Sequence, residues 1–208
     1  MSIGTAIQIE KQRLLLVEGK DEINFFEAIL KDSINNIQII EVGGKSRFRE
    51  ALKALSLAPE FDKVIALGVV RDADDDYKAT FQSVSDGLSD INIIPPLDPV
   101  FFTKTKPSSG IFIMPSFNQK GSIEDLCLEG VKDNREMVCV NDFLNCLKAI
   151  NPNLKQISKR KCLAFLATQD ELKNNVGLAA KKGYWNFSSK LYNSLKTFLN
   201  ELEKVLKN

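Results

Sequence analysis

The sequence predicts an α/β protein in which helices flank a mainly parallel central sheet. Three short apolar runs, at residues 13–18, 37–42 and 63–70, have the length and continuity of strands that are buried on both faces. Each run is followed by a segment of helical periodicity, at 21–30, 46–57 and 77–88. Strands that alternate with helices at this spacing indicate parallel pairing through right-handed crossovers.

Local signals support each of these elements in turn. Asp21 is placed to cap the first helix, whose apolar stripe includes Ile23 and Phe26. Gly43 and Gly44 end the second strand, and helical periodicity resumes at residue 46. The third strand ends in the acidic stretch 71–76, Arg-Asp-Ala-Asp-Asp-Asp, and a third helix follows it.

The alternation of predicted strands and helices is interrupted after residue 90. Four prolines fall within 91–109, and β-like residues at 100–103 and 111–114 predict a hairpin. Residues 111–115 are the expected fourth core strand, and Ser122 is placed to cap a short helix after it. From residue 134 the pattern is helical and ends in an amphipathic helix at 186–207. We therefore predict an α/β domain at 1–130 and a helical C-terminal extension, 131–208, packed on it.

The composition excludes several kinds of chemistry. The 208 residues contain no histidine, which rules out serine–histidine and cysteine–histidine catalysis and histidine-bearing zinc sites. The four cysteines form no CxxC pair, so we expect buried, reduced thiols rather than a zinc site or disulfides. No apolar run approaches the ~20 residues of a membrane span. The first residues lack the pattern of a signal peptide, and we expect a cytoplasmic protein.

Charge is distributed unevenly along the chain. Residues 1–150 contain 17 Lys and Arg against 23 Asp and Glu, whereas residues 151–208 contain 11 against 4. An acidic first part can gather metal ions, and a basic second part can meet phosphate groups. A solvated basic helical surface is the alternative explanation of the second imbalance.

Carboxylates follow three of the expected strands. Glu18 ends the first strand, Asp72 and Asp74 end the third, and Glu124 follows the fourth. Ligands of open parallel sheets bind beyond the carboxyl ends of the strands. Alternate residues of an extended segment point the same way, so Asp72 and Asp74 are expected to face one ion. Oxygen ligands without histidine suit Mg²⁺, Mn²⁺ or Ca²⁺, although each acid alone is also common in loops and helix caps.

Two short motifs add a family resemblance. Residues 17–22, Val-Glu-Gly-Lys-Asp-Glu, are followed some fifty residues later by residues 69–74, Val-Val-Arg-Asp-Ala-Asp. Their order, spacing and strand context resemble those of a Toprim domain over about residues 12–130. Residues 121–126, Gly-Ser-Ile-Glu-Asp-Leu, and 183–187, Gly-Tyr-Trp-Asn-Phe, resemble small stand-alone prokaryotic Toprim-like proteins near the overcoming-lysogenization-defect (OLD) nucleases.

The resemblance implies a Rossmann-like Toprim domain and a division of roles. Glu18 would be a metal ligand or general acid/base at the scissile phosphate. Asp72 and Asp74 would hold Mg²⁺, with Glu124 and possibly Asp76 as further ligands. Lys20, beside Glu18, would contact a phosphate as a catalytic residue, unless it is a solvated residue at the start of a helix. No zinc-binding, ATPase or DNA-gate module accompanies the domain here, which departs from the larger Toprim enzymes.

Other features are open to two interpretations. Residues 43–46, Gly-Gly-Lys-Ser, lack the upstream glycine of a phosphate-binding loop, so we interpret them as a tight strand-to-helix turn. Lys45 and Arg47 beside this turn are candidate contacts to a nucleic-acid backbone, as are three residues further along, Lys159, Arg160 and Lys161. The aromatic residues of 184–187 would either stack on a base or anchor the terminal helix to the core.

Two functions follow from these observations. The first is a Mg²⁺-dependent or Mn²⁺-dependent nuclease that cleaves phosphodiesters or transfers phosphoryl groups on DNA or RNA. The second is a non-catalytic module that binds nucleic acid or a partner protein, which the near-neutral net charge of +1 favours. Neither hypothesis specifies an oligomeric state, and fold alone does not decide between them.

Overall fold

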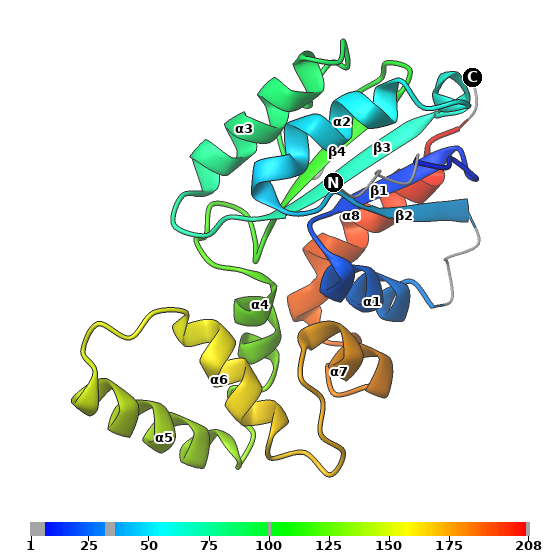
Figure 1. Ribbon diagram of the computed structural model, residues 1–208. Coiled ribbons are helices and arrows are strands. Elements are labelled where there is room, and N and C mark those ends of the chain that lie inside the picture. The colour runs from blue at the N-terminus through cyan, green and yellow to red at the C-terminus, as the bar shows by residue number, and fades with distance from the viewer. Residues whose placement is uncertain (1–6, 32–35, 100, 207–208) are drawn as a thin grey trace.

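The computed structural model describes residues 7–31, 36–99 and 101–206. Four parallel strands form one sheet in the order β2-β1-β3-β4, which confirms the predicted fold class (Figure 1). The strands are β1 (Arg13–Val17), β2 (Ile37–Glu41), β3 (Ala66–Asp72) and β4 (Ser108–Met114). The chain passes from β1 to β2 on one side and then to β3 on the other. The strand order therefore reverses between β1 and β3, where parallel sheets bind ligands.

Helices cover both faces of this sheet (Figure 1). Strand β1 shows why: Leu14 and Leu16 belong to one hydrophobic core, and Leu15 and Val17 belong to the other. The first core contains helices α2 (Phe48–Ser56) and α3 (Tyr77–Ser89), and the second contains α1 (Lys20–Ile29) and α8 (Asn193–Lys204). The predicted strands and helices of the first 90 residues are thus confirmed.

The C-terminal helices complete the second core. They are α4 (Ile123–Gly130), α5 (Met137–Ile150), α6 (Ile157–Leu166) and α7 (Val176–Lys182), followed by α8. Helix α7 packs on α1, and α8 packs on β3 and β4, so much of the predicted extension shares a core with the α/β part. Helix α8 begins at Asn193 rather than at residue 186. None of the helices in the described part of the chain is long and apolar enough to cross a bilayer.

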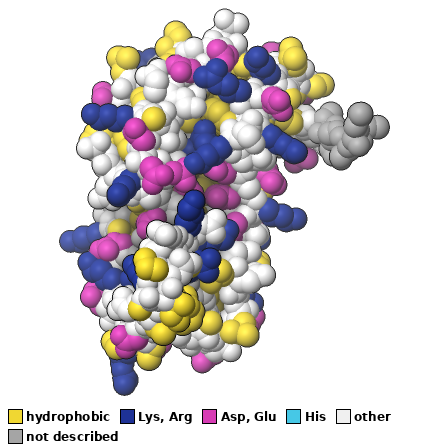
Figure 2. Space-filling model, turned by 60° about the vertical axis from the view of Figure 1, so that its left-hand side comes forward, with side chains coloured by type: hydrophobic (Ala, Val, Ile, Leu, Met, Phe, Trp, Pro, Cys, Tyr) yellow, Lys and Arg dark blue, Asp and Glu magenta, His cyan; other side chains and the backbone are white. Residues whose placement is uncertain are grey.

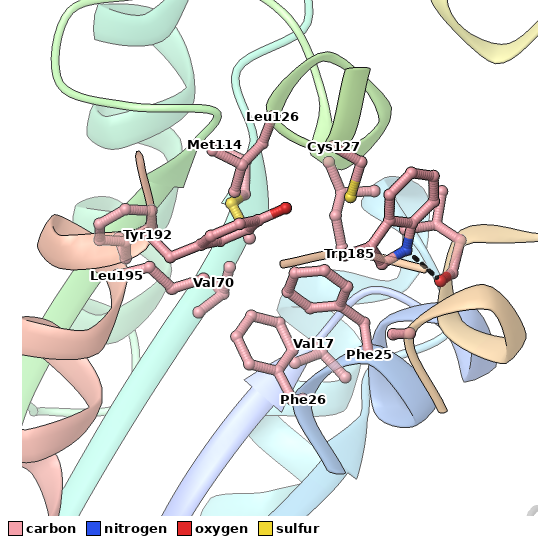
Figure 3. Close-up of a cluster of buried hydrophobic side chains, with 14 of the residues drawn as sticks. Val17, Phe25, Phe26, Val70, Met114, Leu126, Cys127, Trp185, Tyr192 and Leu195 are labelled. Atoms are coloured by element: carbon pink, nitrogen blue, oxygen red, sulfur yellow. Dashed lines mark hydrogen bonds between the residues drawn. The ribbon is translucent and has the colours of Figure 1, made fainter. Parts of the chain in front are cut away.

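An aromatic cluster anchors this C-terminal part (Figure 3). The Trp185 side chain is buried, and its indole N–H donates a hydrogen bond of 2.9 Å to the carbonyl of Val176. Its ring stacks on Phe165, while the ring of Phe187 meets that of Phe25 edge to face. These contacts confirm that residues 184–187 anchor the C-terminal part. The rings of Trp185 and Phe187 pack against other aromatic rings of the protein.

Asp21 caps a different helix from the one expected. Helix α1 begins at Lys20, after Gly19, so Asp21 lies within its first turn. The Asp21 carboxylate instead accepts hydrogen bonds from the backbone N–H groups of Val176 and Gly177, at the start of α7. The prediction was wrong because local sequence shows that a residue can cap a helix, whereas packing decides which helix it meets.

The predicted hairpin before the fourth strand was also wrong. Strand β4 runs parallel to β3 from Ser108 onwards, and residues 101–103 form no strand. They lie beside the start of β4, where the Thr103 N–H donates to the Ser109 carbonyl over 2.9 Å. The Phe102 ring covers Gly110 so closely that a Cβ at that glycine would meet it at 2.5 Å. Because Gly110 has no side chain, the Phe102 ring can pack directly on β4.

The cysteines divide into two pairs. All four are free thiols; Cys127 and Cys162 are buried, whereas Cys139 and Cys146 are exposed. The expectation of reduced thiols is met, but the expectation that all four are buried was wrong. Both exposed thiols lie on α5, whose helical pattern turns one apolar face away from the core.

Candidate active site

An ion pair lies where the strand order reverses. Glu18 directly follows β1, and its Oε1 accepts a hydrogen bond of 3.0 Å from Nε of Arg71, near the end of β3. Both side chains are largely buried, with 18% and 6% exposed. The Arg71 guanidinium also lies 5.1 Å from the ring centre of Phe48. Sequence reasoning missed Arg71, although a charged residue inside an apolar strand was a usable signal.

Asp72 lies near three other carboxylates, Glu18, Glu124 and Glu22. Its Oδ1 accepts a hydrogen bond of 3.0 Å from the backbone N–H of Ile123, at the start of α4. Burial raises the pKa of Asp72 well above its usual value, and the nearby charges of Glu18, Glu124 and Glu22 raise it further. Carboxylates from β1, α1, β3 and α4 therefore act on one another at this point.

Asp72→Asn should stabilise the protein at neutral pH. A folded-state pKa above the unfolded value means that ionised Asp72 opposes folding. This penalty is absent below the ordinary value of 3.8 and grows as the pH rises towards the raised pKa. Asparagine keeps the acceptor for Ile123 without the charge. Denaturant unfolding should show a more stable variant at pH 7 and little difference near pH 4; an equal gain at both pH values would contradict the electrostatic explanation.

Asp74 does not continue the extended backbone of Asp72. Its φ is +48°, in the left-handed region, and its backbone exchanges two hydrogen bonds of 2.8 Å with Gly121. The side chain forms an ion pair with Lys45. The prediction that Asp72 and Asp74 face one ion assumed an extended backbone through both residues. The backbone is not extended at Asp74, so its geometry does not support that prediction.

A pocket of ≈ 340 Å³ opens beside Asp74. It is lined by the acidic stretch 74–76 together with Lys45 and Arg71. Asp76 caps helix α3 there, because its Oδ1 accepts a hydrogen bond of 2.9 Å from the N–H of Ala79. Asp76 therefore has a structural role as the N-cap of α3. Its role as a metal ligand stays a prediction.

Glu124 faces a second, smaller pocket of ≈ 90 Å³. Asp21, Lys159 and the buried Cys162 line it as well. The pKa of Asp21 is raised, chiefly by burial and also by the charge of Glu124, while Lys159 lowers it. Of the three basic residues predicted on α6, Lys159 is thus the one that reaches the carboxylates.

The glycine turn after β2 borders the same crevice. Gly43 and Gly44 have φ values of +77° and +87°, and the N–H of Gly44 donates to the carbonyl of Glu18 over 2.8 Å. This confirms a tight strand-to-helix turn. Arg47 is exposed, close after the turn. Figure 2 shows acidic side chains in the middle of one face, with Lys and Arg side chains around them.

The other predicted contacts lie further out. Lys20 is exposed at the first position of α1, two residues after Glu18. On α6, Arg160 is exposed and its Nε donates to the carbonyl of Lys155 over 3.0 Å, while Lys161 is half-buried. These residues lie on the surface without a contact to the carboxylates that would assign them a role.

The donor chemistry of the site suits a hard cation. Every candidate ligand is a carboxylate, and Mg²⁺ and Mn²⁺ prefer oxygen ligands. The recorded contacts of Glu18 with Arg71 and of Asp72 with Ile123 each use one carboxylate oxygen. Within residues 7–31, 36–99 and 101–206, no three acidic or thiol side chains are already gathered as a metal site. The site therefore suits a hard cation for two reasons. Its candidate ligand atoms are carboxylate oxygens, and the carboxylates around Asp72 repel one another.

Fold and site together define an α/β protein with carboxylates from several elements near the strand-order reversal of a parallel sheet. Residues 12–204 match the model of the family described as "Protein of unknown function (DUF3226)", and the chain belongs to that family. Searches among curated proteins and among solved structures each found no significant match.

Proposed function

We propose that this protein is a Mg²⁺-dependent or Mn²⁺-dependent nuclease that cleaves or transfers phosphodiester groups of nucleic acid. The observation that carries the proposal is the mutual repulsion around Asp72. Burial is the largest cause of the raised pKa of this carboxyl group, and the charges of Glu18, Glu124 and Glu22 raise it further. A bound cation would relieve that repulsion. The order and spacing of the two motifs at residues 17–22 and 69–74, which resemble a Toprim domain, support the same proposal.

Glu18, Asp72 and Glu124 are the residues that would hold the cation. When bound, it would neutralise charge on a phosphate and lower the pKa of a water molecule. Arg71 holds the Glu18 side chain at the strand-order reversal. Asp74 holds Lys45 at the rim of the neighbouring pocket, where that lysine is available to a phosphate group.

Nucleic acid is the proposed substrate because basic groups border the acidic site. Lys45 and Arg47 lie beside the glycine turn, and Lys159 lines the pocket that contains Glu124. Residues 151–208, which carry 11 Lys and Arg against 4 Asp and Glu, supply further positive charge. Such residues bind phosphates without reading sequence, so the proposal covers both DNA and RNA.

One observation favours a non-catalytic binding module instead. Two of the predicted ligands already have a cationic partner in the protein, since Glu18 pairs with Arg71 and Asp74 pairs with Lys45. A module that binds nucleic acid or a partner protein would need these acids only to position the arginine and the lysine. The two functions differ in whether nucleic acid is cleaved.

Thermal unfolding with and without millimolar Mg²⁺ or Mn²⁺ tests the proposal. A cation at 100 times its dissociation constant stabilises a protein by about 2.7 kcal/mol, which for this chain length is a rise of about 5–10 °C. We expect that rise in the wild type and a much smaller one in Asp72→Asn. Glu60→Gln, which changes an exposed acid paired with Lys63, is the matched control and should respond as the wild type does.

A nuclease assay on labelled DNA and RNA completes this test. We expect metal-dependent cleavage by the wild type and by Glu60→Gln, and none by Asp72→Asn. Metal binding without cleavage of either polymer would support a metal-bound module. The absence of both a thermal shift and cleavage would reject the nuclease and leave the binding module.

A further inference from the structure

A cavity of ≈ 400 Å³ lies at the end of the sheet opposite the candidate active site. It is bordered by the beginnings of β3 and β4, by the loop that leads into β4, and by the last turn of α8 (Figure 1). Asp72 is the last residue of β3, at the other end of that strand. The α8 cavity, as we call it, is therefore separate from the carboxylates, and its volume is that of a small-molecule site.

The loop before β4 supplies positive charge to the α8 cavity. Oγ1 of Thr103 accepts a hydrogen bond of 2.9 Å from the N–H of Ser109 and lies 2.9 Å from Oγ1 of Thr105. These bonds hold the loop in one shape and so present Lys104 and Lys106, which both line the cavity, from a fixed backbone. Both lysines are exposed, and neither forms an ion pair with another of the described residues. Their charge is therefore available to an anion.

The last turn of α8 supplies hydrogen-bond acceptors to the same cavity. Glu201 lines it, with a carboxylate oxygen 3.5 Å from Nζ of Lys204. Helix α8 ends at Lys204, and the final carbonyl groups of a helix have no partner within it. The cavity thus offers cations from one segment and acceptor oxygens from another, so a purely anionic ligand would use only part of it.

A third part of the lining is apolar. Ile65, Val205 and Leu206 contribute aliphatic surface, and Phe102 contributes an aromatic ring that packs on Phe198 with 5.2 Å between ring centres. A ligand gains from this surface only if it has a body that buries apolar area. Inorganic phosphate has no such body, and a fatty acid has no donors for the acceptor oxygens of α8.

We propose that the α8 cavity binds a ribonucleoside phosphate. The phosphate group lies at Lys104 and Lys106, because lysine is a point charge suited to phosphate oxygens. The base lies against the apolar lining, and the ribose hydroxyls donate to Glu201, as they do to the acidic residue of many dinucleotide sites. A free nucleotide and the end of an RNA strand share this chemistry. The inference does not rest on the proposed nuclease activity, because the cavity lies at the other end of the sheet.

Isothermal titration calorimetry of the full chain with AMP in the presence of EDTA tests the site. EDTA removes divalent cations, so a metal-bridged contact at the carboxylates cannot produce the signal. We expect binding by the wild type, and binding weakened roughly tenfold or more in the double variant Lys104→Gln with Lys106→Gln, which loses charged contacts to the phosphate. The double variant Lys148→Gln with Lys155→Gln removes the same charge from exposed positions outside the cavity and should bind as the wild type does. The absence of binding at millimolar AMP, or equal weakening by both double variants, overturns the proposal.

Parts of the ligand test the class of molecule. Adenosine and inorganic phosphate should each bind much more weakly than AMP, and phosphate that binds as tightly as AMP overturns the assignment to a nucleoside. The wild type should prefer AMP over 2′-deoxy-AMP several-fold, and Glu201→Gln should lose that preference. Glu203→Gln, on the same helix but outside the cavity lining, should keep it. Equal binding of AMP and 2′-deoxy-AMP by the wild type overturns the contact with Glu201.

An RNA trinucleotide distinguishes the two sources of the ligand. If it binds more tightly than AMP, and the double variant Lys104→Gln with Lys106→Gln weakens it equally, the cavity holds the end of an RNA strand. Tighter binding of AMP assigns the cavity to a free nucleotide. Circular dichroism confirms that each variant is folded, so that a loss of binding is read as a loss of contacts.

Discussion

Gly177→Ala is expected to destabilise the fold by about 3 kcal/mol, at the upper end of the usual cost of overpacking, and to lower Tm by about 10 °C. Gly177 lies in the first turn of α7, where that helix meets α1. A Cβ at this position would lie 2.1 Å from the backbone oxygen of Asp21 and 2.6 Å from Cβ of Asn24. The backbone oxygen cannot turn aside, so α7 would have to move away from α1. That movement would also weaken the two hydrogen bonds by which Asp21 caps α7.

Gly130→Ala is the control for this prediction. Gly130 is the last residue of α4, and a Cβ there would find its nearest neighbours at an ordinary contact distance of 3.4 Å. Alanine is also the better helix former. We expect no loss of stability in this variant when both are measured by denaturant unfolding. Equal losses would mean that the close approach of α7 to α1 does not explain the first result.

Arg71→Met is expected to cost about 3 kcal/mol at neutral pH, the usual consequence of leaving a buried charge without its partner. The variant removes the hydrogen-bonded cation from Glu18, and Glu18 then adds to the negative charge around Asp72. Asp72, whose pKa is raised, takes up a proton as the pH falls, and its repulsion of Glu18 is then removed. The penalty, measured by urea unfolding, should therefore shrink between pH 7 and pH 4.

The double variant Arg71→Met with Glu18→Gln separates charge from packing. If the unpaired carboxylate causes the loss, neutralising Glu18 should restore most of the stability. Arg71 also packs over the ring of Phe48. A double variant as unstable as Arg71→Met, with the same penalty at both pH values, would assign the loss to that contact instead.

The prediction of the strands succeeded because burial on two faces leaves a strong local pattern. Leu14 to Val17 are apolar without interruption, since alternate residues enter two different cores. Residues 91–99 and 101–107, between α3 and β4, have no such pattern. Residues 101–103 look like a strand, yet Phe102 is used to cover Gly110 rather than to pair in the sheet.

Four features can be predicted from the sequence alone: the α/β class, the order of its elements, the absence of histidine chemistry and the placement of carboxylates at the ends of three strands. These features are local, because apolar periodicity and residue type are written in consecutive residues. Two contacts could not be predicted in this way: Glu18 pairs with Arg71, 53 residues away, and Asp21 caps α7, 155 residues away. The folded structure also shows that Asp74 pairs with Lys45 and that Phe143 and Ile150 on α5 stay exposed. A buried polar group must find its partner in space, and the distance along the chain carries no information about which partner that is.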